Sequence, residues 1–401
     1  MRTYFPDIDS ISRTIVARKF PLFTDDISLM ENNLFESYRN KRIIFLGGAG
    51  FIATETIIQV LKYQPKYLAI VDISENAIAD LVRYLRTNNL INSNITIDFY
   101  LADITDNSLN LALNAIGEVD IVFNFAAAKH VRSERNVPSI IRMFDINFLC
   151  LSNLYNCIEN ISPDCKVFTI STDKAADPSN LMGLSKKLME IKSYSLFANL
   201  TSARFANVLF SSGAITANWL SSIQFRKPII SPSKVARFFI TPEESGQLCL
   251  LGVVADRGNV IIPAPGVLTS TDFEQVAKEF LKSLNFQPLS IPVEDYSQNY
   301  WNSNIVEGKY PYVLTNANTE GEKSEEVMKS IHERVISWTK NISRIKIDTY
   351  DDQIKEFEDF VLHIKKNSKE AYTKDMIVNK AKKAIPNFFY LESAHKLDDR
   401  I

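Results

Sequence analysis

Between residues 41 and 225, short apolar runs alternate with longer stretches in which apolar positions recur at helical spacing. We expect the apolar runs to be buried strands, and they cover residues 42–48, 66–72, 95–103, 120–128, 166–172 and 201–209. The stretches between them, such as 55–64 and 75–88, are typical of helices. Strands alternating with helices favour a parallel sheet covered on both faces. The pattern therefore predicts an α/β, Rossmann-like, doubly wound parallel sheet.

The pattern changes on either side of this region. Residues 1–40 are polar with short apolar stretches, and prolines punctuate shorter elements after about residue 225. From about residue 323 the chain becomes rich in charge, and 324–340 and 351–367 both read as helices with a solvated or inter-subunit face. We expect an N-terminal helical arm (1–40), a Rossmann domain (41–225), a smaller substrate lobe interleaved with it (226–345) and a helical C-terminal tail (346–401).

The first candidate site is the string GGAGFIATE, residues 47–55, which follows the first strand and opens a helix. Gly47 and Gly50 let the turn close and let backbone N–H groups approach a pyrophosphate at the helix N-terminus. Ala53 replaces a third glycine, which helix packing tolerates. Asp72 ends the second strand, where a carboxylate holds the ribose hydroxyls of NAD and repels the 2′-phosphate of NADP. The motif predicts NAD as cofactor, with NADP less favoured.

Other strand ends supply further expected cofactor contacts. Asp103 closes the third strand, where it would meet the adenine or else cap a helix. Small residues after the fourth strand leave room for the cofactor to lie close. The expected cofactor-binding residues are Gly47, Gly50, Phe51, Ile52, Asp72, Asp103, Ala126, Ala127, Lys186 and Val208.

The string STDKAADPSNLMGLSKKLME, residues 171–190, contains the lysine of a Tyr-x-x-x-Lys pair but not its tyrosine. On a helix Met182 and Lys186 share one face, so Lys186 remains able to hold a cofactor. A thioether has no proton to give and is a weak acceptor, so Met182 is neither acid nor base. The acid–base chemistry must therefore come from other residues.

Thr172, Asp173 and Lys174 provide replacements at the carboxyl end of a strand, where open α/β sheets place their ligands. In a reaction that removes one proton from the substrate and delivers another, a protonated aspartic acid can act as the acid and an adjacent neutral lysine as the base. We expect burial to raise the pKa of Asp173 and to lower that of Lys174. The alternative is a surface Asp–Lys turn before Pro178.

A third group of candidates would contact substrate. Lys129, after the fourth strand, is placed to reach a sugar or phosphate oxygen, whereas His130 beside it is more often a structural residue. Asn207 and Arg237 are candidate donors to the phosphates of a bound nucleotide. The expected substrate contacts are Lys129, Ser171, Met182, Asn207 and Arg237.

Composition narrows the class of protein. Lys+Arg 45 against Asp+Glu 47 gives no cationic excess, which argues against a nucleic-acid or anionic-membrane partner. We see no apolar run of about 18 residues for a membrane span, and the charged N-terminal stretch is unlike a signal peptide. The 4 cysteines show no C-x-x-C spacing, as expected for reduced thiols in a cytoplasm, and the 4 scattered histidines predict no metal site.

These residues carry a resemblance. The chain resembles extended short-chain dehydrogenase/reductases, in particular the bacterial polysaccharide-biosynthesis branch that includes UDP-N-acetylglucosamine 4,6-dehydratases. The matching strings occur in the family's order: GGAGFIATE, DISENAIADLVRYLR, AAAKHVRSERNVPS, STDKAADPSNLMGLSKK, RFANVLFSSG, ARFFITPEESG and TEGEKSEE. The STDKAA string followed by Asn-x-Met-Gly is specific, and some members of this branch carry methionine at the position of Met182.

The resemblance implies a redox-neutral lyase reaction on a nucleotide sugar, UDP-linked by analogy. NAD+ takes a hydride from C4 while a base removes the hydroxyl proton; a base then removes the C5 proton, water leaves from C6, and the hydride returns to C6. By position Lys174 matches the C5 base, Asp173 the acid for the C6 hydroxyl, and Lys186 the lysine that holds the cofactor. Thr172, Asp173 or a bound water are the candidates to take the C4 hydroxyl proton.

The resemblance also implies a homo-oligomer, with the tail helices as candidate interface, and an enzyme free in the cytoplasm, since the membrane-anchored members carry helices ahead of this domain. Phe210 stands where glycine is common beside the nicotinamide, and we expect its ring to narrow the pocket. The alternatives are a nucleotide-sugar 4-epimerase or 5-epimerising dehydratase, and a catalytically silent NAD-binding scaffold. Met182 argues against a simple 4-epimerase, which is expected to need the tyrosine.

Overall fold

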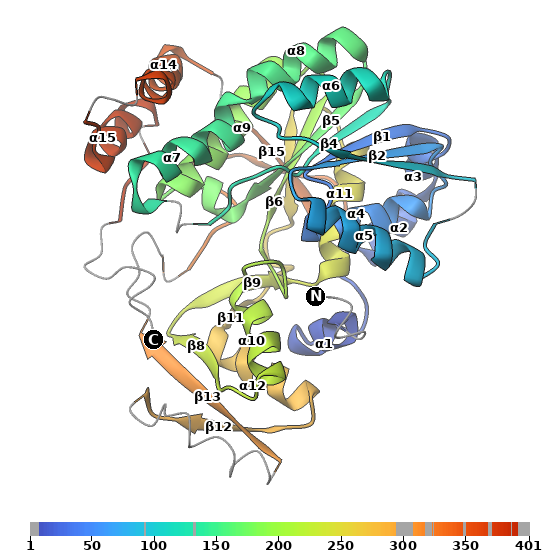
Figure 1. Cartoon of the computed structure of the whole chain (residues 1–401). Coiled ribbons are helices and arrows are strands. Elements are labelled where there is room, and N and C mark those ends of the chain that lie inside the picture. The colour runs from blue at the N-terminus through green and yellow to red at the C-terminus, as the bar shows by residue number, and fades with distance from the viewer. Residues whose placement is uncertain are drawn as a thin grey trace.

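The computed structural model describes residues 8–91, 94–130, 134–293, 308–316, 323, 325–347, 350–367, 371–385 and 387–391. A nine-stranded sheet crosses the larger part of the molecule in the order β14-β15-β10-β6-β5-β4-β1-β2-β3 (Figure 1). Its strands are β1 Arg42–Leu46, β2 Tyr67–Asp72, β3 Thr96–Leu101, β4 Ile121–Asn124, β5 Lys166–Thr172, β6 Leu200–Phe205, β10 Asn259–Pro263, β14 Val335–Ser337 and β15 Ile342–Lys346.

The sheet is parallel from β3 to β10, and β15 and β14 close it with antiparallel pairings. Helices cover both faces, which confirms the predicted doubly wound α/β fold. They are α3 Glu31–Tyr38, α4 Phe51–Leu61, α5 Glu75–Thr87, α6 Asn107–Ile116, α7 Val137–Phe144, α8 Leu151–Ile161, α9 Leu181–Leu196 and α11 Pro242–Val254.

Strand β1 shows how the two layers are filled. Ile43 and Phe45 face a core shared with α3, α4, α5 and α11, whereas Ile44 and Leu46 face a core shared with α6, α8 and α9. Side chains alternate along a strand, so a run that is apolar at every position is buried on both faces. The predicted apolar runs therefore correspond to strands of this sheet.

Strand order reverses between β1 and β4, because β1 is followed by β2 and β3 on one side and by β4 and β5 on the other. At such a point the connecting loops diverge and leave a crevice at the carboxyl ends of the strands. The glycine turn after β1 and the segment after β4 meet there.

A smaller lobe lies beneath these carboxyl ends (Figure 1). It contains two three-stranded sheets, β11-β9-β7 and β12-β13-β8. Its elements are β7 Asn207–Val208, β8 Ile229–Ser233, β9 Ala236–Ile240, β11 Ser270–Asp272, β12 Gln287–Ile291, β13 Lys309–Asn316, α10 Ile215–Gln224 and α12 Phe273–Ser283. In the N-terminal segment, α1 Ile8–Ile15 packs into the core of this lobe, and α2 Thr24–Leu29 precedes α3.

Two C-terminal helices, α14 Asp352–Lys366 and α15 Lys374–Ala384, pack against α7 and α9. The ring of Phe357 in α14 lies edge-on to Phe144 of α7, with centroids 5.3 Å apart. Among the described residues, no helix combines the length and apolar character that crossing a bilayer requires.

The predicted helix over 324–340 is wrong. Its described residues form turns and the short strand β14. The charges that suggested a solvated helix instead pair inside the protein: Glu333 accepts hydrogen bonds from Arg204 and Lys187. Ion pairs with distant residues thus fix this segment in a non-helical path.

Candidate functional site

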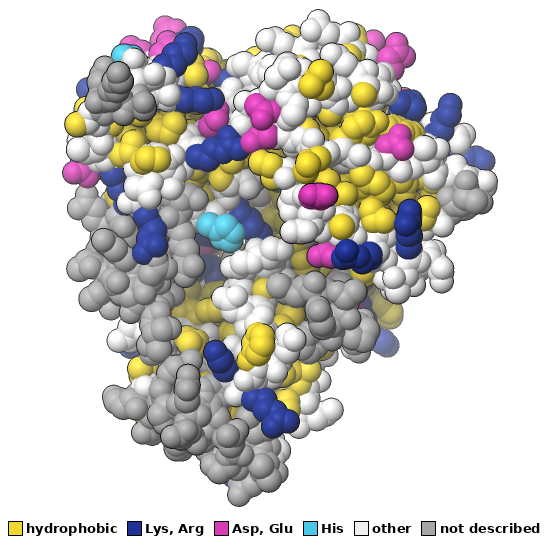
Figure 2. Space-filling view, in the orientation of Figure 1, with side chains coloured by type: hydrophobic (Ala, Val, Ile, Leu, Met, Phe, Trp, Pro, Cys, Tyr) yellow, Lys and Arg dark blue, Asp and Glu magenta, His cyan; other side chains and the backbone are white. Residues whose placement is uncertain are grey.

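A cavity of about 400 Å³ opens at the carboxyl ends of β1, β4, β5 and β6, between the sheet and the smaller lobe. In Figure 2 the surface is hollowed between these two parts of the molecule. Many of the residues predicted to bind cofactor or substrate line it: Gly47, Gly50, Phe51, Ile52, Ala127, Lys129, Ser171, Thr172, Lys174, Met182, Lys186, Asn207 and Val208. His130 also lines the cavity.

The glycine turn forms one wall of the cavity. Gly47 has a φ of +68°, and a Cβ placed on it would lie 2.7 Å from the backbone nitrogen of Ala126. Only glycine satisfies both conditions without strain. Gly50 is the N-cap of α4 and has no side chain to cover the first N–H groups of that helix. The turn thus presents unhindered backbone donors at a helix N-terminus, which suits an anionic ligand.

Asp72 lies beside this turn rather than in the cavity lining. Its carboxylate accepts hydrogen bonds from the backbone nitrogens of Ala49 and Ser74, each at 3.0 Å. The side chain therefore fixes the glycine turn relative to the end of β2.

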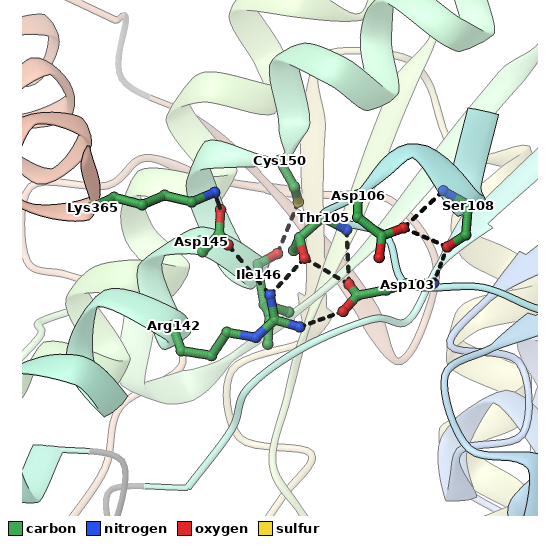
Figure 3. Close-up of polar contacts among 9 residues, drawn as sticks. All are labelled: Asp103, Thr105, Asp106, Ser108, Arg142, Asp145, Ile146, Cys150 and Lys365. Carbon is green, nitrogen blue, oxygen red and sulfur yellow. Dashed lines mark hydrogen bonds and ion pairs between the residues drawn. The ribbon is translucent and has the colours of Figure 1, made fainter. Parts of the chain in front are cut away.

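Asp103 lies outside the cavity lining, in the polar network drawn in Figure 3. Its carboxylate accepts from Arg142 at 2.5 Å and from the backbone N–H and hydroxyl of Thr105 at 2.9 and 2.7 Å. Burial acts to raise the pKa of Asp103, but the hydrogen bonds from Thr105 and Arg142 outweigh it and lower the pKa. The N-cap of α6 is Asp106, so Asp103 is not the helix cap.

The same network reaches the C-terminal helices. Arg142 also lies 3.3 Å from Asp145, and Asp145 accepts from Lys365 of α14 at 2.7 Å (Figure 3). This network of ion pairs thus connects α14 to the end of α7 and to the loop after β3.

The residues of the STDKAA string form a compact acid–base group at the end of β5. The Thr172 hydroxyl donates to Oδ1 of Asp173 at 2.8 Å, and Nζ of Lys174 donates to the same oxygen at 3.1 Å. Asp173 is 1% exposed and lies behind the other two, which line the cavity. The hydroxyl and the amine are therefore linked through one buried carboxylate, and these residues do not form a surface turn.

The expected lowering of the pKa of Lys174 is wrong. Burial does act to lower it, but the nearby charges of Asp173 and Glu326 outweigh burial and raise the pKa of Lys174. Glu326 is buried, and its Oε1 lies 3.8 Å from Lys174 Nζ. Sequence reasoning gave Glu326 no role, although the string TEGEKSEE that contains it is one of the matching strings.

Met182 and Lys186 lie in α9, whose residues from Leu181 to Ser193 are all buried and which Asn180 caps through the Gly183 nitrogen. Nζ of Lys186 donates to the Ile170 carbonyl at 3.1 Å. Burial lowers the pKa of Lys186 to about 8, against the charges of Glu190 and Cys150. Lys186 is thus a titratable cation in the cavity wall.

Arg237, predicted to contact substrate, lies outside the cavity lining. It is 4% exposed, and its guanidinium donates to the carbonyls of Ala236 and Lys323 at 2.8 and 2.9 Å. It therefore holds the segment that carries Glu326. Lys129 does line the cavity, and burial lowers its pKa.

The expectation that Phe210 narrows the pocket is wrong. The residue has a φ of +60°, and its ring is fully buried against Phe280 in the core of the smaller lobe, near Trp219. Phe210 is not part of the cavity wall, which the nearby Val208 and Ser211 line instead.

Two supporting residues were not predicted. Asn147 lies in a π-helical turn at Asp145–Leu149, where its side chain accepts a hydrogen bond from the N–H of Ala128 and donates one to the carbonyl of Ala128. It belongs to none of the motifs identified in the sequence. Glu134 accepts from the Met182 nitrogen at 2.9 Å and from the Tyr390 hydroxyl at 3.1 Å. Both contacts join segments that are far apart in sequence, so a local pattern could not reveal them.

Comparison with known proteins gives a consistent family relationship. The model of a family described as polysaccharide biosynthesis protein matches residues 43–334. An uncharacterized membrane protein of Methanocaldococcus jannaschii is 30% identical over 278 residues, 66% of this chain and 79% of the relative. The capsular polysaccharide biosynthesis protein CapD of Staphylococcus aureus is 29% identical over 59% of this chain and 39% of its own length. A UDP-glucose 4-epimerase of Rickettsia bellii is 29% identical over 53% of this chain and 62% of its own.

The matches to CapD and to the epimerase span less than two thirds of the length of those relatives.

Solved structures share the fold at low sequence identity. Pen from Bacillus thuringiensis gives a TM-score of 0.62 at 19% identity, over 82% of this chain and 98% of that chain. A UDP-N-acetylglucosamine 4-epimerase from Methanobrevibacter ruminantium gives 0.54 at 18% identity, over 73% and 90%.

Proposed function

Since the chain belongs to the polysaccharide biosynthesis protein family, we propose that it is a nucleotide-sugar-modifying enzyme, specifically an NAD-dependent 4,6-dehydratase. Its proposed substrate is UDP-N-acetylglucosamine, and its product a UDP-4-keto-6-deoxy-N-acetylhexosamine used for a surface polysaccharide or glycan. The names of the relatives support nucleotide-sugar chemistry, and the site supports dehydration.

One observation carries the proposal: Thr172 and Lys174 line the cavity and share Oδ1 of the buried Asp173. A dehydration needs one group to remove a proton from carbon and another to protonate a departing hydroxyl. A hydroxyl, a carboxyl and an amine linked in this way supply those functions without a tyrosine.

The chain's residues fit a nicotinamide dinucleotide. The close approach of Gly47 to Ala126 and the uncapped start of α4 leave room and donors for a pyrophosphate. Asp72 at the end of β2 favours NAD, because its carboxylate repels a 2′-phosphate. Lys186 would hold the nicotinamide ribose. When bound, the nicotinamide would supply the hydride-transfer chemistry that the reaction needs at C4 and C6.

The chain's own part in the reaction is proton transfer. Thr172 takes the C4 hydroxyl proton and passes it to Asp173 along their 2.8 Å hydrogen bond. Lys174 removes the C5 proton, and Asp173 protonates the departing C6 hydroxyl. Met182 lines the wall as an apolar contact and transfers no proton.

The test is a proton NMR time course of the purified protein with UDP-N-acetylglucosamine and NAD+ in D2O. We expect a 6-deoxy methyl signal, with deuterium at C5. Lys174→Ala should slow product formation by at least about 100-fold, as loss of a general base does. Met182→Leu, which keeps an apolar side chain, should leave product formation within a few-fold of the unaltered protein.

Other outcomes point elsewhere. Inversion at C4 without a methyl signal would indicate a 4-epimerase, the activity named for the Rickettsia relatives. An unchanged spectrum, repeated with GDP- and dTDP-sugars, would indicate a silent NAD-binding scaffold.

A further inference from the structure

A second buried carboxylate, that of Glu326, faces the Asp173–Lys174 pair from a distant segment. Nζ of Lys174 lies 3.1 Å from Asp173 and 3.8 Å from Glu326, whose side chain is 2% exposed. Oδ2 of Asp173 and Oε2 of Glu326 accept no hydrogen bond from the described residues, although Lys323 lies 3.9 Å from Oε2. Each carboxylate therefore has an oxygen on which a proton can be held.

The inference deepens the proposed dehydratase and rests on it. That reaction removes one proton from the C4 hydroxyl and another from C5. Met182 offers no acceptor for the first, so it passes through Thr172 to Asp173 and stays there until the C6 hydroxyl leaves. Asp173 is then unable to hold the proton that Lys174 must lose before it acts as a base. A second acceptor next to Lys174 would let the neutral amine form without releasing this proton to solvent.

We propose that Glu326 is this acceptor: it takes a proton from the Lys174 ammonium and holds it through the turnover. An N–H bond of Lys174 breaks and an O–H bond forms on Glu326, which leaves a neutral amine and a neutral carboxylic acid. The amine takes the C5 proton, the C5–H electron pair forms the C5–C6 double bond, and the C6–O bond breaks as Asp173 supplies the proton that completes water.

The cycle then closes with every proton accounted for. When hydride has returned to C6, Lys174 gives its proton back to C5 and is again a neutral amine. Glu326 keeps its proton until the product leaves, when the proton returns to Lys174. Asp173 ends as the carboxylate that it was at the start.

The surroundings of Glu326 suit this role. Lys174 and Asp173 face it from the turn after β5, Arg237 from β9, and Lys323 from its own segment. Burial raises the pKa of Glu326, assisted by Asp173 and opposed by the three cations, and the net change is upward. Substrate that excludes water from the cavity would favour the neutral acid and amine further, because charges are costly in a dry site.

The proposal has a pH signature. In the unaltered protein one proton moves between Lys174 and Glu326 without entering solvent, so the C5 step should be independent of pH near neutrality. In Glu326→Gln the ammonium must lose its proton to solvent, and the rate should rise about tenfold per pH unit below the pKa of Lys174. Glu326→Asp should restore the flat profile at a lower rate.

The measurement is deuterium entry at C5 as a function of pH, with reduced nicotinamide followed in the same samples. Glu326→Gln should still form reduced nicotinamide, because the route from Thr172 to Asp173 is intact. Glu325→Gln is the matched control: it removes the same charge from the exposed neighbouring residue and should keep the flat profile.

A second readout needs no turnover. Amine-selective labelling of the ligand-free protein, quantified at Lys174 over a range of pH, should show a lower pKa for Lys174 in Glu326→Gln. Glu325→Gln should leave it unchanged. The lowering is expected because Glu326 is one of two anions that stabilise the ammonium.

Several results would overturn the proposal. The first is a rate of deuterium entry at C5 that does not depend on pH in Glu326→Gln. The second is a rate in the unaltered protein that already rises about tenfold per pH unit across neutrality. The third is that Glu326→Gln loses both nicotinamide reduction and C5 exchange and Glu326→Asp does not restore them. If the unaltered protein dehydrates no nucleotide sugar, the proposed function fails instead, and the labelling still reports whether Glu326 controls Lys174.

Discussion

Lys186 is a buried cation whose protonation changes close to neutral pH. Burial lowers its pKa to about 8, and only the protonated form has the charge and the three donors that would hold a ribose. We predict that NAD+ binds most tightly below pH 8 and that affinity falls as the pH rises through this value. Binding titrations between about pH 6.5 and 9.5 would measure the change.

Two variants make this prediction specific. Lys186→Met should bind NAD+ more weakly and show little dependence on pH, because the titrating group is gone. Lys66→Met, which removes an exposed lysine at the opposite end of β2, should follow the unaltered protein. Equal affinity at both ends of the pH range in the unaltered protein would contradict the proposed role of Lys186.

Single residues were predictable where they are neighbours in sequence. Thr172, Asp173 and Lys174 are consecutive at a strand end, so their grouping followed from local pattern alone. The pKa of Lys174 was predicted in the wrong direction because the charge of Asp173 outweighs burial, together with that of Glu326, which reaches the site from a distant segment. A sequence pattern shows which groups are present but not which charges fold against them.

At the scale of elements, burial decides which signals are reliable. Apart from the edge strand β3, the parallel strands are largely buried, so their apolar runs were recognisable, and the glycine turn after β1 was placed correctly beside them. The run at 120–128 forms a strand only to Asn124, since the residues after it leave the sheet towards Gly47. Helix predictions that rested on charge alone were less reliable. The helix predicted at 351–367 is confirmed as α14, whereas 324–340 has no helix in its described part.

The contact of α14 with α7 gives a prediction for these elements. Phe357 is fully buried and packs edge-on against Phe144. Phe357→Ala should lower the free energy of unfolding by about 3–5 kcal/mol, through lost burial and the cavity left behind. Urea unfolding would measure the change.

An exposed phenylalanine provides the comparison for Phe357. Phe20 is 64% exposed, and Phe20→Ala should change the free energy of unfolding by no more than about 0.5 kcal/mol. A similar loss in both variants would show that α14 is not held by this contact.

At the scale of the whole molecule, the tail helices are bound within their own chain. The apolar residues of α14 and α15 pack with those of α7 and α9 in one core. The predicted homo-oligomer stays a prediction, and an interface built on this tail would use its exposed residues, which are mostly polar but include Met376.

A buried ion network joins parts of the fold that are far apart in sequence. Arg204 of β6 is fully buried between Glu190 of α9 and Glu333, which precedes the edge strand β14. Lys187 pairs with Glu333 at 3.0 Å. Removing one member leaves the others charged and buried, so the network should affect the stability of the entire chain rather than one loop.

The contribution of this ion network to stability can be tested through the pH dependence of Glu333. Burial acts to raise its pKa, but Arg204 and Lys187 outweigh burial and lower it from 4.5 to about 2. A carboxylate whose pKa is lower in the folded than in the unfolded protein stabilises the fold at pH values above the unfolded-state pKa. This contribution is lost as the pH falls through the folded-state pKa. We predict that Glu333→Gln lowers the free energy of unfolding at pH 7 by on the order of 3 kcal/mol, and that the difference from the unaltered protein shrinks between about pH 4.5 and 2.

Urea unfolding at neutral and acidic pH would measure this difference, with the exposed Glu325→Gln as control. Glu325 lies outside the network, so its variant should follow the unaltered protein at both pH values. A difference for Glu333→Gln that stays constant from neutral to acidic pH would mean that shape, and not ionisation, gives Glu333 its effect. A shrinking difference would instead show that the charge on Glu333 helps to hold β6, α9 and the segment before β14 together.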